Sequence, residues 1–275
     1  STPIPKDIFG PRPGKPEHMN MWTKWKKQDG MPIYKDRSFD SWVKQYNEAV
    51  SAIDEGIGRI FKALEASDQL DNTIIIFTSD QGFAWGDHGL RDKRYPYDAA
   101  LRNPLIVYAP NRFVQGETCD FPINGPDIVR TIHSLADVKP GIPLDGRDFT
   151  TLLKEPAHDK SWTDEPMIQT YTCNIYDNSR IEQAIREKNW KALTFDNSPA
   201  WIMLHTGRYK YTRYLAEDCI EELYDLRSDP EELDNLAIRK DSRKKLEMLR
   251  LQTINAFRNK GADYVDILPE PKLIP

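Results

Sequence analysis

The sequence predicts an α/β fold, with part of a sheet sandwiched by helices and then a small α+β subdomain with an antiparallel sheet. Residues 38–67 have the spacing of a long amphipathic helix, and two short apolar runs follow at 72–80 and 105–109. Later in the chain the pattern changes to short β-like runs separated by turn residues. We therefore expect two parts, residues 1–162 and residues 163–275.

The first part is expected to supply a helix, two strands and a second helix. The run at 73–77 is continuously apolar and β-branched, which is typical of a strand covered on both faces. The run at 105–109 has the same character and ends at Pro110, and a helix is expected at 127–135. Gaps of three and four define one buried face of the long helix, formed by Phe39, Val43, Tyr46, Val50, Ile53, Ile57, Ile60, Phe61 and Leu64.

The second part is expected to be a small antiparallel sheet with a final helix. The β-like runs lie at 166–171, 200–205, 209–214 and 222–226. The pair Gly207-Arg208 separates two of these runs and predicts a hairpin, and the final amphipathic helix is expected at 241–258. Residues 1–37 have no sustained period, so we expect an irregular segment laid over a larger body.

Composition narrows the classes of function. The chain has 275 residues, and 38 basic minus 43 acidic side chains give a net charge of −5, which argues against a basic nucleic-acid footprint. No apolar run is long enough to span a bilayer. The three cysteines, Cys119, Cys173 and Cys219, do not resemble a disulfide framework and are expected to be buried thiols. The chain starts without methionine or signal-peptide features, so we expect a processed or truncated product.

The stretch from Ser79 to Lys93 is the main candidate for chemistry. It leaves the carboxyl end of a predicted strand, which is where α/β sheets bind ligands. Asp80 and Gln81 supply a carboxylate and an amide oxygen, which suit a hard cation such as Ca²⁺ or Mg²⁺. Lys93 could fold back to contact an anion held by that metal. On these residues alone, a solvated loop with a capping aspartate and a surface lysine explains the stretch equally well.

An ordered set of motifs over residues 46–237 resembles the sulfatase family of the alkaline phosphatase superfamily. The motifs are the helix segment Tyr46–Asp54, the strand end Thr78-Ser79-Asp80-Gln81-Gly82, then Gly86-Asp87-His88-Gly89, Lys93 and Pro104–Pro110, the helix Asp127–Ile132, the turn Asp145-Gly146-Arg147, and the segments Gly207–Tyr211 and Glu222–Ala237. The resemblance implies an alkaline-phosphatase-like sheet, with residues 1–162 as the C-terminal part of the large domain and 163–275 as the C-terminal subdomain.

The resemblance also implies roles for individual residues. Asp80 and Gln81 match two metal ligands of the family, usually to calcium, and Lys93 matches the lysine that contacts the sulfate group. His88 lies at a recurrent histidine near the pocket, as a catalytic group or, equally, as a structural hydrogen-bond partner. His18 and His205 are further candidates for substrate binding, whereas His133 and His158 are expected to be structural or solvated.

The family's nucleophile is not found in this sequence. Relatives carry a Cys or Ser, oxidised to formylglycine, in the pattern Cys/Ser-x-Pro-x-Arg, and none of the three cysteines has this context. The segment Ser1–Pro5 comes near but has Pro5 in place of the arginine. The chain thus resembles the C-terminal portion of a sulfatase. We expect the missing N-terminal half as a partner, weak metal binding and no turnover alone, and an exposed apolar edge with poor solubility unless a partner covers 73–79.

The expected function is therefore that of the C-terminal part of a formylglycine- and calcium-dependent sulfatase acting on a carbohydrate sulfate ester in polysaccharide degradation. The expected substrate is a sulfated small molecule or glycan, with no nucleic acid and no membrane span involved. The alternatives are a phosphodiester or phosphonate monoester hydrolase of the same superfamily and a non-catalytic carbohydrate-binding or interaction fragment. The resemblance implies a periplasmic or secreted location.

Overall fold

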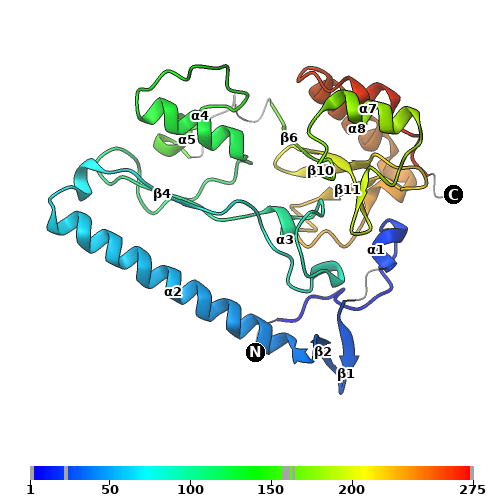
Figure 1. Ribbon diagram of the computed structural model, residues 1–275, viewed down its shortest axis with the longest axis horizontal. Coiled ribbons are helices and arrows are strands. Elements are labelled where there is room, and N and C mark those ends of the chain that lie inside the picture. The colour runs from blue at the N-terminus through cyan, green and yellow to red at the C-terminus, as the bar shows by residue number, and fades with distance from the viewer. Residues whose placement is uncertain (1–2, 22–23, 157–161, 163–164, 273–275) are drawn as a thin grey trace.

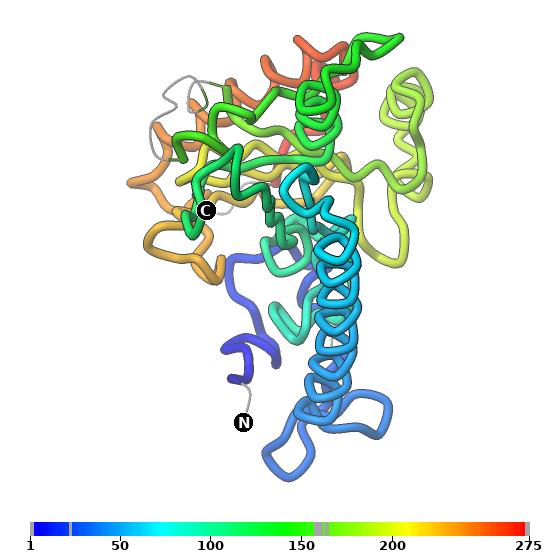
Figure 2. The backbone as a smooth tube through the Cα atoms, turned by 90° about the vertical axis from the view of Figure 1, so that its left-hand side faces the viewer, coloured from blue at the N-terminus to red at the C-terminus, as the bar shows by residue number. Residues whose placement is uncertain are grey.

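A computed structural model describes residues 3–21, 24–156, 162 and 165–272. Figure 1 shows the long helix α2 (Phe39–Ala66) along one side of the molecule, with β4 (Ile75–Thr78) running back beside it and the C-terminal elements gathered at the other end. From the side, α2 stands along the outside of the molecule (Figure 2). Helices and antiparallel strands alternate in the order expected, which confirms the α/β class. His158 and the first two residues of the Ser1–Pro5 segment lie outside the described residues.

Helix α2 begins and ends within one residue of the predicted range 38–67. The Ser38 side chain caps it by accepting a hydrogen bond from the backbone N–H of Ser41 at 3.2 Å. Of the predicted apolar face, however, only Phe39 and Val43 are buried. Large apolar side chains farther along remain open to solvent, namely Tyr46, Val50, Ile53 and Ile60.

Strands β4 and β5 (Leu105–Tyr108) form a two-stranded antiparallel ribbon, with Ile75 opposite Tyr108. One face of β5 packs against the cluster around Phe149, but Ile106 on the other face is 59% exposed. Ile75, Ile76 and Phe77 of β4 are likewise only half-buried, so the prediction that these strands are covered on both faces is wrong for this chain. The continuous apolar run is real, but among the described residues β4 has only one neighbouring strand.

The second part contains a four-stranded antiparallel sheet in the order β11-β10-β9-β6. Its strands are β6 (Met167–Tyr171), β9 (Trp201–His205), β10 (Tyr209–Tyr214) and β11 (Glu222–Asp225). All four predicted strands and the hairpin between β9 and β10 are confirmed. Ile202 and Leu204 point to the side covered by α7 (Asn178–Arg186) and α8 (Arg243–Arg258), while Trp201 and Met203 face Leu101 of the first part.

The remaining elements are short. They are α3 (Asp98–Leu101), α4 (Gly125–Leu135), α5 (Thr150–Lys154), β7 (Thr194–Phe195) and β8 (Ser198–Pro199), with 3-10 turns at Leu70–Asn72, Asp87–Gly89, Leu236–Ile238, Lys240–Ser242 and Asp263–Ile267. A capping box between Asn124 and Asp127 starts α4, which confirms the predicted helix there. The Cys173 thiol is buried, whereas Cys119 and Cys219 are half-buried, and all three are free. Within the described residues, no helix is both long and apolar enough to cross a bilayer.

The expectation of an irregular segment at residues 1–37 is wrong in part. The segment contains α1 (Glu17–Met21) and a small antiparallel sheet of β1 (Lys26–Gln28), β2 (Met31–Tyr34) and β3 (Arg37–Ser38). The turn between β1 and β2 is Asp29-Gly30, and both residues have positive φ, 48° and 81°. An Asp-Gly pair is the preferred sequence of such a hairpin turn.

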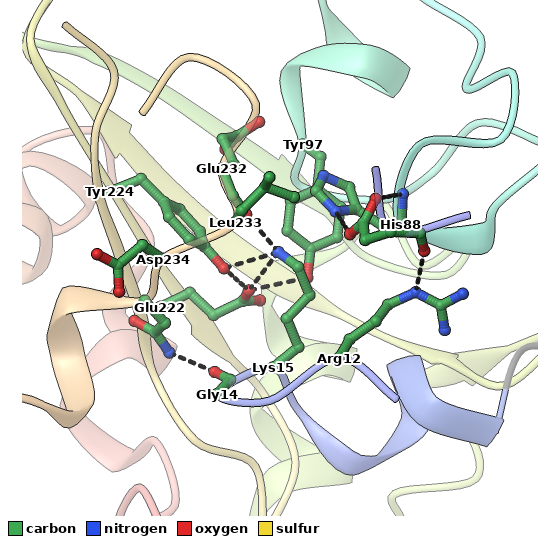
Figure 3. Close-up of polar contacts among 12 residues, drawn as sticks. Arg12, Gly14, Lys15, His88, Tyr97, Glu222, Tyr224, Glu232, Leu233 and Asp234 are labelled. Atoms are coloured by element: carbon green, nitrogen blue, oxygen red, sulfur yellow. Dashed lines mark hydrogen bonds and ion pairs between the residues drawn. The ribbon is translucent and has the colours of Figure 1, made fainter. Parts of the chain in front are cut away.

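A buried carboxylate joins the N-terminal segment to the C-terminal sheet (Figure 3). Glu222 has no exposed surface and accepts hydrogen bonds from the hydroxyls of Tyr97, Tyr214 and Tyr224 at 2.8, 2.6 and 2.5 Å. The Lys15 ammonium donates to the Tyr224 hydroxyl at 2.9 Å and lies 3.8 Å from the Glu222 carboxylate. These contacts satisfy a charge that would be costly to bury alone.

A second buried cation links α3 to the C-terminal part. The Lys210 ammonium is fully buried and lies 2.7 Å from Asp98 Oδ1 and 2.5 Å from Glu232 Oε1. The other Glu232 oxygen accepts from the backbone N–H of Asp98 at 2.6 Å. Burial opposes the charge on Lys210, but the two carboxylates outweigh it and raise the pKa of this ammonium. The two parts of the chain are thus held together by paired charges as well as apolar contacts.

We predict that Lys210→Met lowers the free energy of unfolding by about 3–5 kcal/mol, because it leaves the buried carboxylate of Glu232 and the half-buried one of Asp98 without their cation. Urea denaturation followed by tryptophan fluorescence measures this change. The matched control is Lys191→Met at an exposed lysine, which should change stability by less than about 0.5 kcal/mol. A loss no larger than that of the control would show that the ion pairs contribute little to stability.

Candidate functional site

The loop after β4 closes on itself. The backbone N–H of Ala84 donates to the carbonyl of Asp92 at 2.9 Å, and Gly86 N–H donates to the Leu90 carbonyl at 2.8 Å. These bonds bring the end of the loop back to its beginning. Gln81 lies three residues before Ala84, and Lys93 directly follows Asp92, so both flank the closed part of the loop.

Asp80 and Gln81 lie side by side at the carboxyl end of β4. The Gln81 amide nitrogen donates to Asp80 Oδ2 at 3.2 Å, and Asp80 itself is exposed. A carboxylate oxygen and an amide oxygen fit a hard cation, but two ligands do not fill a calcium site. Within the described ranges, no group of three or more His, Cys, Asp or Glu side chains could hold a metal ion. Further ligands would have to come from outside these residues.

The Lys93 side chain is exposed at the base of the loop. Its backbone N–H donates to Asp92 Oδ1 at 2.8 Å, whereas no hydrogen bond or ion pair in the described part of the chain engages its ammonium group. The ammonium group can therefore contact an anion without first breaking an internal ion pair.

Gly82 and Asn103 bind this loop to the segment that follows α3. A Cβ atom at Gly82 would lie 2.6 Å from the backbone oxygen of Arg102 and 2.9 Å from the carbonyl carbon of Ala100, so only glycine fits this approach. The Asn103 amide donates to the carbonyl of Ser79, and Thr78 Oγ1 donates to the Pro104 carbonyl at 2.9 Å. The strand end with Asp80 is thus fixed against residues 100–104.

His88 is held in the wall of the loop by Asp7. It has a left-handed backbone with φ 52°, its backbone N–H donates to Asp7 Oδ1 at 2.8 Å, and its Nδ1 lies 2.6 Å from Asp7 Oδ2. The ring is only 2% exposed, and burial lowers the pKa of His88. Burial opposes the charge on Asp7, but the hydrogen bonds from His88 outweigh it and lower the pKa of this carboxyl.

A hollow of about 330 Å³ lies beside His88. Its walls come from the loop, from α3 with the residue after it, and from the C-terminal part, and they are Asp87, His88, Asp98, Ala99, Arg102, Pro230, Glu231 and Glu232. Burial raises the pKa of Glu232 to about 7. The hollow is polar and contains both hydrogen-bond acceptors and the donors of one guanidinium group.

The two other candidate histidines lie apart from the metal-ligand candidates in sequence and in their contacts. His205 ends β9, and its Nδ1 accepts from the backbone N–H of Gly207 at 2.9 Å. Burial lowers the pKa of His205 to about 4, with Asp98 opposing this, so it lies near one wall of the hollow. His18 on α1 packs edge-on against the Tyr214 ring, with centroids 5.0 Å apart, and burial lowers its pKa to about 4. His133 lies on α4, where its Nδ1 approaches the Val129 carbonyl.

Sequence reasoning missed Asp7 and Arg102. Asp7 lies 81 positions from His88 in a segment expected to be irregular, so no local pattern connects the two. Arg102 lies two residues before the Pro104-Leu105-Ile106 motif, and this position is the one sequence feature that could have pointed to it.

Comparison with known proteins finds two matching family models and a set of similar proteins. The family model described as Sulfatase matches residues 15–138, and the model described as N-sulphoglucosamine sulphohydrolase, C-terminal, matches residues 86–205. The N-acetylglucosamine-6-O-sulfatase of Bacteroides thetaiotaomicron is 28% identical over 233 residues, which are 82% of this chain and 38% of that protein. The arylsulfatase of Clostridium perfringens is 25% identical over 224 residues, which are 80% of this chain and 41% of that protein.

Solved structures share the fold. A structure in complex with its substrate, D-glucosamine-2-N,6-O-disulfate, matches 96% of this chain and 61% of that chain, with a TM-score of 0.73 and 20% identity. The phosphonate monoester hydrolase of Agrobacterium radiobacter matches 76% of this chain and 40% of that chain, with a TM-score of 0.62 and 23% identity. The chain spans about two fifths of the length of the two curated relatives named above. The two family models together match residues 15–205, and over this range the chain is similar to the sulfatase family in its motifs and its fold.

Proposed function

We propose that this chain is the carboxyl-terminal part of a sulfatase that hydrolyses a sulfate ester of a carbohydrate. The strand end with Asp80 and Gln81 is the observation that supports the proposal most directly, because a closed loop follows it and leads to Lys93, whose ammonium group has no partner among the described residues. The relatives named as N-acetylglucosamine-6-O-sulfatase and ulvan-active sulfatase support a sugar as the carrier of the sulfate.

In this proposal the side chains have separate roles. Asp80 and Gln81 would hold a calcium ion together with ligands from the rest of the enzyme, and such an ion would supply positive charge for the sulfate oxygens. Lys93 places a second positive charge beside the same sulfate, where negative charge grows as the sulfur–oxygen bond to the sugar breaks. The overall reaction adds water across that bond and yields the free sugar hydroxyl and inorganic sulfate. The formylglycine nucleophile belongs to the part of the enzyme that this chain does not contain.

The proposed partner is the remaining, amino-terminal part of the sulfatase domain. The exposed apolar side chains of α2 and β5 would lie in that contact, together with the open edge of β4. Residues 1–162 would then complete the large domain, and residues 163–275 would form the subdomain beside it. A periplasmic or secreted location would suit a polymeric sulfated glycan as substrate.

A phosphonate monoester or phosphodiester substrate is the second candidate. It is favoured by the fold shared with the phosphonate monoester hydrolase, whose TM-score is 0.62. The strand-end ligands and the lysine suit either tetrahedral anion, so substrate assays have to separate the two reactions.

We predict that Lys93→Ala lowers kcat/KM for sulfate esters by about 10²–10³-fold in the complete enzyme, because a charge that stabilises the transition state is lost. Initial rates with sulfate monoesters, phosphate diesters and phosphonate monoesters measure this. The exposed control Lys191→Ala should retain full activity. Cleavage of the phosphorus esters with sulfate esters left untouched would reject the sulfatase assignment.

A chelator should abolish activity of the complete enzyme, and added calcium should restore it. Asp80→Asn removes one ligand charge, so the calcium concentration for half-maximal activity should rise by about tenfold or more. Asp71→Asn, at an exposed aspartate that precedes β4, is the control and should behave as the parent. Full activity after exhaustive chelation would contradict a role for Asp80 and Gln81 as metal ligands.

We predict that Ile53→Glu weakens binding of this chain to the amino-terminal part by about 100-fold, because the proposed contact would bury an unpaired charge. Ile53 is 51% exposed, so the change should leave the chain's own stability nearly unaltered. Titration calorimetry measures the affinity, with Lys62→Glu on the polar face of α2 as control. Equal affinities for both variants, or a chain that alone is a monodisperse and cooperatively melting monomer, would argue against this contact.

A further inference from the structure

Arg102 projects from the end of α3 into the wall of the hollow. Arg102 is exposed, and no hydrogen bond or ion pair among the described residues involves its guanidinium group. Two other cations nearby are already paired, since Lys210 lies 2.7 Å from Asp98 and Lys6 lies 2.5 Å from Glu231. Arg102 therefore presents free donors to whatever enters the hollow.

The hollow lies next to the candidate sulfate site. The backbone oxygen of Arg102 packs against Gly82, the residue that follows the two metal-ligand candidates. The opposite walls come from Asp87 in the closed loop and from Pro230 and Glu231 in the C-terminal part. The hollow and the candidate sulfate site thus share the loop after β4 and the segment at Arg102.

The chemistry of the walls suits hydroxyl groups. Asp87 offers carboxylate oxygens that accept hydrogen bonds, and Arg102 offers a planar group that donates up to five. The volume of about 330 Å³ is at the lower end of the range for small-molecule pockets, which fits about one sugar residue. Carboxylates and a guanidinium group together match the mixed donors and acceptors of a sugar ring better than they match an apolar or a purely anionic ligand.

We propose that this hollow binds the sugar part of the substrate and that Arg102 is a specificity-determining residue there, donating hydrogen bonds to oxygens of the sugar. The inference rests on the proposed sulfatase function and adds to it the site that distinguishes a glycan sulfate from a simple aryl sulfate. Arg102 has no part in the chemistry at sulfur. Its loss therefore weakens recognition of the sugar and leaves the bond-breaking step unchanged.

The test compares two kinds of substrate with the complete enzyme. Arg102→Gln should lower kcat/KM for N-acetylglucosamine 6-sulfate, or for the sulfated monosaccharide that the parent enzyme cleaves best, by about 10–100-fold, as for a lost charge-assisted hydrogen bond. Most of the loss should be in KM. Activity on 4-nitrophenyl sulfate, which has no sugar, should stay within about twofold of the parent. Arg102→Lys keeps the charge without the planar fork and should recover part of the loss.

Arg112→Gln, at another exposed arginine, is the matched control and should leave both activities unchanged. An equal loss on both substrates would overturn the inference, because Arg102 would then contact the sulfate group or stabilise the fold. A lowered melting temperature would indicate an effect on stability, and an unchanged one a contact with the sulfate. Unchanged activity on every sulfated sugar would also overturn it. A parent enzyme that cleaves the aryl sulfate but no sulfated sugar would refute the sugar site, whereas one that cleaves no sulfate ester would refute the proposed function itself.

Discussion

The pairing of buried charges is the constraint on which the arrangement of this molecule depends. Lys210 forms ion pairs with Asp98 of α3 and with Glu232 of the C-terminal part. Glu222 accepts hydrogen bonds from three tyrosine hydroxyls and lies close to the Lys15 ammonium. Each group would be costly to bury alone, so the segments that carry them have to stay together. Since α3 leads directly to Arg102 and Asn103, the same contacts fix the strand end that carries Asp80.

Much of the fold could be predicted because its signals are local. The spacing of apolar residues in α2 and in the four strands of the C-terminal sheet is contained in short windows, and these elements appear within a few residues of the predicted ranges. The small sheet of β1, β2 and β3 was not predicted, although Asp29-Gly30 is a strong hairpin signal. Strands β1 and β2 have only three and four residues, which is too short to show a clear alternation of polar and apolar side chains.

The rest could not be predicted because it depends on distant partners. The apolar run at 73–77 is typical of a strand that is buried on both faces. Whether such a strand is buried depends on the elements that pack against it, and within the described residues β4 pairs with β5 alone. The contact of Asp7 with His88 joins positions 81 residues apart. The motifs placed Asp80, Gln81 and Lys93 in one stretch, and backbone hydrogen bonds close the loop that lies between Gln81 and Lys93. Whether they act as ligands and as an anion contact stays a prediction.

The open face and the incomplete ligand set have one physical explanation. In the proposed metal site, the side chains at the end of β4 would supply two oxygen ligands. Within the described residues, β4 is paired on one edge alone and apolar side chains nearby are exposed to solvent. A strand that brings further ligands to this edge would at the same time pair the open backbone and bury the apolar face. Assembly and metal binding would then be one equilibrium, because each supplies free energy that the other lacks. An enzyme built in this way has an active site only when its sheet is complete, and the ligands alone, in an isolated chain, should bind the cation weakly.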